Sequence, residues 1–274
     1  MTNSTVEPND GRVDRDGAAP LVRFANVSKF FGQGDRRVHA VDQVSFIAHR
    51  GEFVAILGPS GCGKSTMMML AAGLIPASAG SIEIDGRRIE GPYTDLGIVF
   101  QQDLLMDWRR VLGNVLVQPE FRGLRTRDFE PRAIELLKLV GLAGFEDKYP
   151  YELSGGMRQR VSICRALVHD PELLLMDEPF GALDALTRDQ MNLDLQRIWQ
   201  DNRKTVLFVT HSIAEAVFLA DRVFIMAPRP TRILEEITID LPRPRNLDIR
   251  EAREFAAYVH KITHLFYQMG ILRS

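Results

Sequence analysis

The sequence predicts an α/β fold with a mostly parallel core sheet, an N-terminal antiparallel β subdomain and an inserted α-helical subdomain. Three observations lead to this prediction. After residue 50, apolar β-like runs alternate with helical segments, and such alternation indicates a parallel sheet. Before residue 50, two β-like runs follow each other with no helical segment between them. Over about residues 102–170 the apolar periodicity is helical, and this stretch interrupts the alternation as an insertion.

The expected strands are read from short apolar runs. Residues 21–27 and 39–48 form the two N-terminal runs, and residues 52–58 are apolar after Glu52, as expected of a strand buried on both faces. Gly51 lies between the second and third runs and favours a hairpin connection. The remaining expected elements are strands over 81–85, 96–100, 173–178, 205–210 and 222–227, and helices over 67–74, 157–168, 183–202 and 213–220.

Composition divides the chain into a leader, a main domain and a C-terminal helix. Residues 1–20 are rich in Pro, Gly, Asn and Asp and lack the basic and apolar parts of a signal peptide, so we expect a disordered leader. The main domain is expected over residues 21–244. Residues 245–274 predict an amphipathic helix that packs against its own domain or a partner, from the helical spacing of Phe255, Val259, Ile262, Phe266 and Met269.

Charge and cysteine content exclude several classes of protein. The 34 basic and 36 acidic residues give a net charge of −2, which disfavours a nucleic-acid partner. Two cysteines cannot form a disulfide framework and fit a reducing cytosol. The longest apolar run, residues 67–75, is far shorter than the roughly 20 residues of a membrane-spanning helix, so we expect no such helix.

A phosphate-binding loop is the strongest local signal. The string GPSGCGKS, residues 58–65, follows an apolar strand, precedes a helix and matches the pattern G-x-x-x-x-G-K-[ST]. Its backbone N–H groups and the N-terminus of the following helix would hold nucleotide phosphates, which makes a P-loop NTPase the expected fold; a chance Gly-rich turn is the alternative. Lys64 would neutralise the β- and γ-phosphates and the Ser65 hydroxyl would ligate Mg²⁺. The expected nucleotide-binding residues are Gly58, Pro59, Ser60, Gly61, Cys62, Gly63, Lys64, Ser65 and Thr66.

Two acidic residues complete the expected chemistry. Asp177 and Glu178 end the apolar string LLLMDE, and ligands of open α/β sheets bind beyond the carboxyl ends of the strands. We expect Asp177 to hold Mg²⁺ through water. Glu178 is expected to polarise the attacking water as a general base. Cys62, inside the loop near Lys64, is either an incidental small residue or a thiol with a lowered pKa.

A second predicted anion-binding site indicates a resemblance to a known family. In the string LSGGMRQR, residues 153–160, a serine and two glycines open a helix, and a compact domain does not need two such sites for one triphosphate. Here the chain resembles the ABC ATPase family, whose LSGGQ signature it matches with Met157 in place of Gln. In that family two subunits pack head to tail. The resemblance implies that Ser154, Gly155 and Gly156 of one subunit cap the γ-phosphate held by the other.

The resemblance, which covers about residues 21–244, supplies two further nucleotide contacts. Phe31 resembles the aromatic residue that stacks on adenine, and the neighbouring Phe30 competes for this role. Gln101 resembles the Q-loop glutamine that reaches Mg²⁺ and the attacking water. Gln102 is the alternative, but Gln101 directly follows the apolar strand.

The loops after the later strands carry two more family residues. Asp184, in the string GALD, resembles the D-loop aspartate that contacts the opposing subunit; Gly181 stands where Ser is commoner. His211 resembles the switch histidine that holds the γ-phosphate against the catalytic acid. Ser212 and Glu215 predict a capping box, which would place His211 at a strand-to-helix junction.

The resemblance also implies a function. It implies an ATP hydrolase that uses ATP and Mg²⁺, forms a homodimer and lies peripherally on the cytoplasmic face of the cell membrane. There it would power import through a separate permease, served indirectly by a periplasmic or extracellular substrate-binding protein. A groove beside the Q-loop would receive a short helix of the permease, with Trp108 and Leu112 as candidate lining residues, although core packing would explain them too.

The cargo class and the competing functions depend on weaker signals. Residues 226–233 and 241–245 resemble the nitrate, sulfonate and taurine importer group and imply a small anion as cargo, although rigid turns with solvated charges would explain them equally. One alternative is a soluble ABC ATPase acting on nucleic acid or ribosomes. Another is an unrelated P-loop nucleotidase or GTPase, but the N-K-x-D base-reading motif of GTPases is absent.

Overall fold

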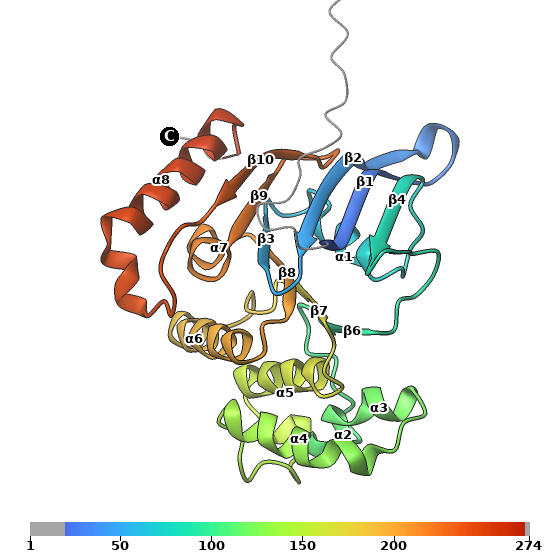
Figure 1. The fold of residues 1–274 in the computed structure, drawn as a ribbon, viewed down its shortest axis with the longest axis vertical. Coiled ribbons are helices and arrows are strands. Elements are labelled where there is room, and N and C mark those ends of the chain that lie inside the picture. Colours follow the sequence, from blue (N-terminus) through green and yellow to red (C-terminus); the bar gives the residue numbers. More distant parts are fainter. Residues whose placement is uncertain (1–19, 272–274) are drawn as a thin grey trace, which may run out of the picture.

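Two β-sheets form the centre of the molecule, known from a computed structural model that describes residues 20–271 (Figure 1). The expected leader at residues 1–20 lies outside this range, apart from Pro20, which begins the first strand. The predicted α/β architecture, with a mostly parallel sheet, an N-terminal antiparallel sheet and an added helical block, is confirmed.

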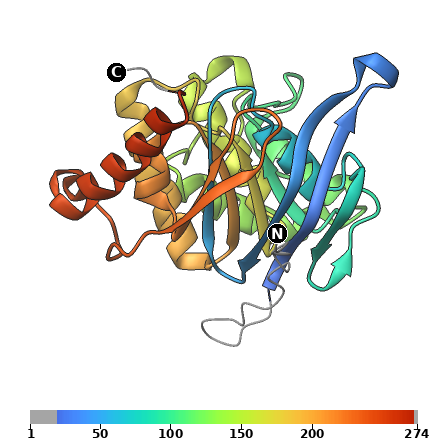
Figure 2. The ribbon, with the colours of Figure 1, turned by 90° about the horizontal axis from the view of Figure 1, so that it is seen from above.

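The N-terminal sheet has four antiparallel strands. Its strand order is β2-β1-β4-β5, and β1 pairs with β2 along nearly its whole length. In space, the sheet stands beside the larger one, on the side away from the C-terminal helix (Figure 2). Its strands are β1 (Pro20–Phe31), β2 (Val38–His49), β4 (Ala79–Ile84) and β5 (Arg87–Arg88).

The core sheet has six strands in the order β10-β9-β3-β8-β7-β6. All neighbouring strands are parallel except β10 and β9, so the other five strands end at one common edge. The strands are β3 (Phe53–Leu57), β6 (Leu96–Val99), β7 (Leu173–Asp177), β8 (Thr205–Thr210), β9 (Arg222–Met226) and β10 (Ile233–Thr238).

The hairpin predicted at Gly51 is wrong. β2 pairs with β1, whereas β3 pairs in parallel with β8 and β9. Gly51 does adopt a left-handed turn (φ +71°), but this turn takes the chain from one sheet to the other. The reason lies in β3, whose five residues are all buried. A strand covered on both faces belongs inside a parallel sheet rather than in a hairpin with the half-exposed β2.

Two hydrophobic cores lie on the two faces of the core sheet. Successive side chains of a strand point to opposite faces, and in β3 this places Phe53, Ala55 and Leu57 in one core and Val54 and Ile56 in the other. The first core includes helices α5 (Gly155–Leu167), α6 (Ala185–Asn202), α7 (Ile213–Leu219) and α8 (Arg253–Gln268). The second includes α1 (Lys64–Ala71) and the antiparallel sheet. The central strand that leads into the phosphate loop is therefore packed from both sides.

The helices divide between the sheet and the inserted block. In Figure 1, α2, α3 and α4 lie together at the end of the molecule away from β10, and α5 lies between them and the sheet. The helices are α1 (Lys64–Ala71), α2 (Val111–Val115), α3 (Val117–Phe121), α4 (Thr126–Leu139), α5 (Gly155–Leu167), α6 (Ala185–Asn202), α7 (Ile213–Leu219) and α8 (Arg253–Gln268).

The C-terminal helix packs against its own domain. Phe255, Ile262 and Phe266 of α8 are buried in the core that α7 also lines. The predicted apolar stripe therefore faces inward, while Val259 and Met269 pack against the edge of the same core.

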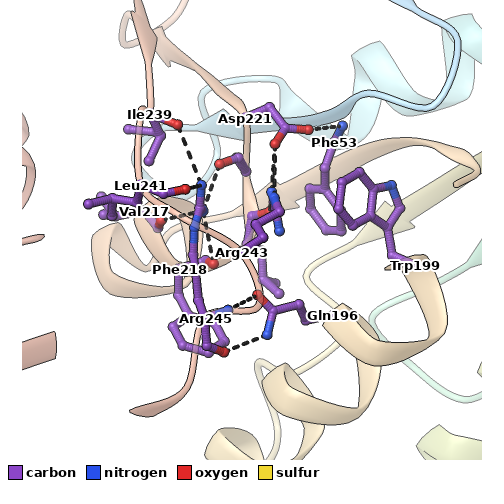
Figure 3. Close-up of polar contacts among 12 residues, drawn as sticks. Phe53, Gln196, Trp199, Val217, Phe218, Asp221, Ile239, Leu241, Arg243 and Arg245 are labelled. Carbon is purple, nitrogen blue, oxygen red and sulfur yellow. Dashed lines mark hydrogen bonds and ion pairs between the residues drawn. The ribbon is translucent and has the colours of Figure 1, made fainter. Parts of the chain in front are cut away.

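A buried arginine holds the segment that leads to α8 (Figure 3). Arg245 is 1% exposed, and Gln196 of α6 donates to its backbone carbonyl and accepts from its backbone N–H. Burial lowers the pKa of Arg245 to about 10, so the guanidinium keeps its charge at neutral pH. Its charge is neutralised by carbonyl dipoles, because the guanidinium donates to the carbonyl oxygens of Val217, Phe218, Ala220, Ile239 and Leu241.

Arg243 extends these contacts to the central strand. Its guanidinium donates to Leu219 O and to the carboxylate of Asp221, and lies 4.3 Å from the ring of Trp199. Asp221 in turn accepts from the N–H of Phe53 at the start of β3. The segment Arg243–Arg245 thus ties α6, α7 and β3 together (Figure 3). Because Phe53 begins β3 and the phosphate loop follows its last residue, these contacts lie at the opposite end of that strand.

Replacing Arg245 should destabilise the fold strongly. In Arg245→Met the five carbonyl groups lose their shared donor in a dry environment, so we expect the free energy of unfolding to fall by about 3 kcal/mol or more. Chemical denaturation measures this change. Arg127→Met, at an exposed position of α4, is the control and should stay within about 0.5 kcal/mol of the parent protein. Equal midpoints for the two variants would contradict this account of Arg245.

Candidate functional site

The site lies where the parallel strands end. β3 runs into the phosphate loop, β7 ends at Asp177 with Glu178 next, β8 is followed by His211, and Gln101 comes shortly after β6. Because these strands are parallel and adjacent, their following loops meet at one edge of the sheet. The fold therefore gathers residues that are far apart in the sequence.

Lys64 is folded into the phosphate loop. Its side chain is 4% exposed, and its ammonium group donates to the carbonyl oxygens of Gly58 and Pro59 at 3.0 Å each. The same nitrogen lies 3.3 Å from Oε1 of Glu178. A buried lysine with this set of oxygen partners marks the place where a negatively charged group would be neutralised.

The segment after β9 packs against the phosphate loop. This support was not predicted from the sequence. Arg229 donates to the carbonyl of Gly61 at 2.9 Å. A Cβ on Gly63 would lie 3.2 Å from Cγ2 of Thr231, a fully buried residue whose N–H donates to Ala40 O. The sequence predicted residues 226–233 to be either a sign of the importer group or a rigid turn with solvated charges. Their prolines and arginines gave no indication that they pack under the loop.

Asp177 and Ser65 fit a magnesium site. Burial raises the pKa of Asp177, and a hydrogen bond from the Ser65 hydroxyl opposes this rise. Among residues 20–271 no group of three His, Cys, Asp or Glu side chains could hold a metal. A hydroxyl and one carboxylate suit Mg²⁺, which takes its other ligands from water and substrate phosphates.

Glu178 connects the lysine with the expected switch histidine. Its Oε2 lies 3.1 Å from Nδ1 of His211, and its Oε1 faces Lys64. The backbone of Glu178 is left-handed (φ +45°), a conformation that costs energy and is typical of functional sites. Its N–H donates to Val209 O of β8, which fixes the residue at the sheet edge. The carboxylate is therefore held by contacts on both sides.

Only half of the predicted capping box forms beside His211. Ser212 caps α7 by accepting from the N–H of Glu215 at 3.3 Å, as predicted. The carboxylate of Glu215 does not return to Ser212, because it accepts from the hydroxyl of Thr210 at 2.7 Å. The N–H of Ser212 donates to that same hydroxyl at 3.0 Å. His211 is half-exposed and lies in the sequence between Thr210 and Ser212, which this hydrogen bond joins.

The expected Q-loop and D-loop residues lie side by side. A Cβ on Gly181 would lie 3.6 Å from Nε2 of Gln101, and the N–H of Gly181 donates to Glu178 O at 3.1 Å. Asp184 is exposed and caps α6 by accepting from the N–H of Thr187, which lowers its pKa. Gln101 and Glu178 thus both lie next to Gly181, while Asp184 is exposed.

The signature, residues 154–156, begins α5. Ser154 accepts from the N–H of Met157 at 3.3 Å, so the predicted helix start is confirmed. A Cβ on Gly156 would lie only 2.7 Å from Cγ2 of Thr187, so this glycine is required by close packing on α6. Among the residues that the structure describes, no hydrogen bond or ion pair joins residues 154–156 to residues 58–66.

The two candidate adenine-stacking residues differ in how free their rings are. Phe30 stacks on His39 with ring centres 4.2 Å apart, and the guanidinium of Arg37 lies 3.9 Å from its ring centre. Phe31 is 39% exposed, and its ring contacts the ammonium of Lys29, which lies 5.1 Å from the ring centre. This arrangement favours Phe31 as the ring available to a ligand.

The remaining candidate residues are the two cysteines and the two residues of the expected permease groove. Cys62 is buried in the loop, and Cys164 is fully buried, which raises its thiol pKa. Trp108 is 76% exposed, whereas Leu112 packs against the core of the helical block. Sequence reasoning therefore grouped two residues of different environments. Within residues 20–271, no helix has the length and apolar character needed to cross a membrane.

Comparison with known proteins decides the family. The ABC transporter family model matches residues 41–181. The taurine import ATP-binding protein TauB of Rhizobium johnstonii is 50% identical over 93% of this chain and 99% of its own length. An uncharacterized ABC transporter ATP-binding protein of Methanocaldococcus jannaschii is 46% identical over 95% of this chain and 96% of its own. This chain belongs to the ABC transporter ATP-binding family.

A solved structure agrees with this assignment. The dimeric post-hydrolysis state of an ATP-binding cassette bound to ADP and Pi has a TM-score of 0.71 and 31% sequence identity, and the match covers 81% of this chain and all of that one. As an ABC ATPase, the chain binds and hydrolyses ATP. The buried Lys64 at the phosphate loop is the residue through which this binding is most simply tested.

Lys64→Ala should weaken ATP binding. The triphosphate loses its buried counter-charge, and charged hydrogen bonds contribute about 1.5–3 kcal/mol, so we expect affinity to fall roughly tenfold or more. Isothermal titration calorimetry with ATP measures the change. Lys138→Ala, at an exposed position on α4, is the matched control and should bind ATP like the parent. Parent-like affinity of Lys64→Ala would contradict the assigned role of Lys64.

Proposed function

We propose that this ABC ATPase works as a homodimer that powers import of a small anion, such as nitrate, a sulfonate or taurine, through a separate membrane permease. One observation supports the dimer: the signature at residues 154–156 opens α5, and among residues 20–271 it makes no hydrogen bond or ion pair with the chain's own phosphate loop. Two relatives named as taurine importers, from Rhizobium johnstonii and Escherichia coli O157:H7, support the cargo class.

In this proposal the nucleotide phosphates compete with the carboxylate of Glu178 for the ammonium of Lys64, which lies 3.3 Å from it. The β- and γ-phosphates then take the ammonium of Lys64, and Glu178 is released to act on water. The adenine ring stacks on Phe31, and Ser154 to Gly156 of the second subunit close over the γ-phosphate, while Asp184 contacts that subunit. Ser65, Asp177 and Gln101 would hold Mg²⁺, which would neutralise charge on the phosphates.

Hydrolysis then follows from the placement of Glu178. Water oxygen bonds to the γ-phosphorus, one water proton passes to Glu178, and the bond to the β–γ bridging oxygen breaks to give ADP and phosphate. His211, beside Glu178, donates a hydrogen bond to the γ-phosphate and holds it in line. The enzyme works peripherally at the cytoplasmic face of the membrane. It depends on a substrate-binding protein only indirectly and has no nucleic-acid partner.

Glu178→Gln tests the base and the dimer together. The amide keeps the size of the side chain but cannot take the proton, so we expect hydrolysis to fall by roughly 10²-fold or more. The variant should bind ATP and remain as a closed dimer on size-exclusion chromatography, alone or in the assembled complex. Ser154→Arg in the same background is the control and should block closure. A turnover rate equal to that of the parent would refute the assigned base.

Trp108 tests the coupling to the permease. A ring that is 76% exposed beside the Q-loop is suited to contact a helix of the membrane subunit. We expect Trp108→Glu to abolish transport in the assembled complex and to leave basal ATP hydrolysis within about twofold, a change of less than 1 kcal/mol. The control is Phe121→Glu, because Phe121 is 71% exposed on the same helical block. Loss of both activities in Trp108→Glu would show a structural role instead.

A further inference from the structure

Arg188 makes contact with the loop that carries Asp184. It lies in the first turn of α6, and its Nη2 donates to the carbonyl of Leu183 at 2.8 Å. Its backbone N–H donates to Asp184 O. The guanidinium therefore follows any displacement of residues 183–184, the part of the chain expected to face a second subunit.

Glu215 is the acidic partner of Arg188 and is unusual for its burial. Its side chain is 8% exposed, and its Oε1 lies 3.6 Å from Nε of Arg188. A buried carboxylate is costly unless it is paired and hydrogen-bonded. In the predicted capping box the carboxylate of Glu215 would accept from the backbone N–H of Ser212. That contact is not made, so it does not explain the burial of this carboxylate. What holds Glu215 is Arg188 on one side and the hydroxyl of Thr210 on the other.

Thr210 carries the chain of contacts to the site. Its hydroxyl donates to Glu215 and accepts from the N–H of Ser212, so both neighbours of His211 are fixed by one hydroxyl group. His211 in turn lies 3.1 Å from Glu178. Polar contacts therefore run from the carbonyl of Leu183 to Thr210, the peptide bonds on either side of His211 continue the path, and the His211 ring completes it to Glu178.

We propose that Arg188 and Glu215 are positioning residues that couple the Asp184 loop to His211. When Asp184 meets a second subunit, the shift is transmitted through the ion pair to Thr210 and sets the orientation of His211 toward Glu178. This inference rests on the dimer and on the roles of Glu178 and His211 proposed above. It adds a route by which contact between subunits reaches the reacting phosphate.

A double-mutant cycle in the full-length protein tests the coupling. Glu215→Gln keeps an oxygen for the Thr210 hydroxyl and removes the charge, and Arg188→Met removes the guanidinium while keeping much of its length. Each single variant should lower kcat roughly threefold to thirtyfold with little change in KM for ATP, and the double variant should be no worse than the poorer single one, because the pair acts as a unit. Arg188→Lys, which keeps the charge, should recover part of kcat.

Stability is separated from positioning by a control outside the site. Arg245→Met destabilises the same two helices away from the Arg188–Glu215 pair, and it should keep the parent kcat at a temperature where it is folded. Effects of Arg188→Met and Glu215→Gln that multiply in the double variant would overturn the proposal, as would an equal loss of kcat in Arg245→Met. If Glu178→Gln fails to dimerise or still hydrolyses ATP at the parent rate, the proposed function fails instead, so the two failures are distinguishable.

Discussion

The parallel register of β6, β7, β8 and β3 is the constraint on which the site depends. Every functional loop leaves the sheet at the same edge because these strands run in the same direction beside one another. β3 is fixed most firmly, since apolar side chains pack against both of its faces. The phosphate loop that continues from it inherits this rigidity, and the backbone N–H groups expected to hold phosphate are oriented before any ligand arrives.

Charged side chains buried at that edge need partners, and here they are paired with one another. Lys64 is paired with Glu178, and Glu178 lies between Lys64 and His211. Such a pair gives little net stability, because removing two charges from water offsets most of their attraction. Its value is geometric: Lys64 and His211 hold the carboxylate of Glu178 at the edge of the sheet where the phosphate loop begins. This placement suits the role proposed for Glu178 as the general base.

Local strings predicted the family and the positions of the phosphate loop and the helix starts well, because phosphate binding requires a contiguous loop and a helix start. The loop around Lys64, the helix start at Ser154 and the acids at the end of β7 needed no knowledge of distant contacts. The hairpin at Gly51 was wrong because the burial of β3 on both faces overrode a local turn signal. The actual roles of Glu215 and Arg245 were beyond prediction, since their partners come from other elements and a single sequence does not show which elements meet. Thr231 and Arg229 were missed for the same reason.

Contacts at two levels along α6 and α7 have a mechanical consequence. At the nucleotide edge, Arg188 and Glu215 join the two helices; two turns farther along α6, Gln196 holds the backbone of Arg245, whose guanidinium holds the last carbonyls of α7. Two helices that are linked at two levels resist independent tilting. The loops that begin them carry Asp184 and His211. A displacement of one loop is then shared by the other, which is what coupling between a subunit interface and a reacting phosphate requires.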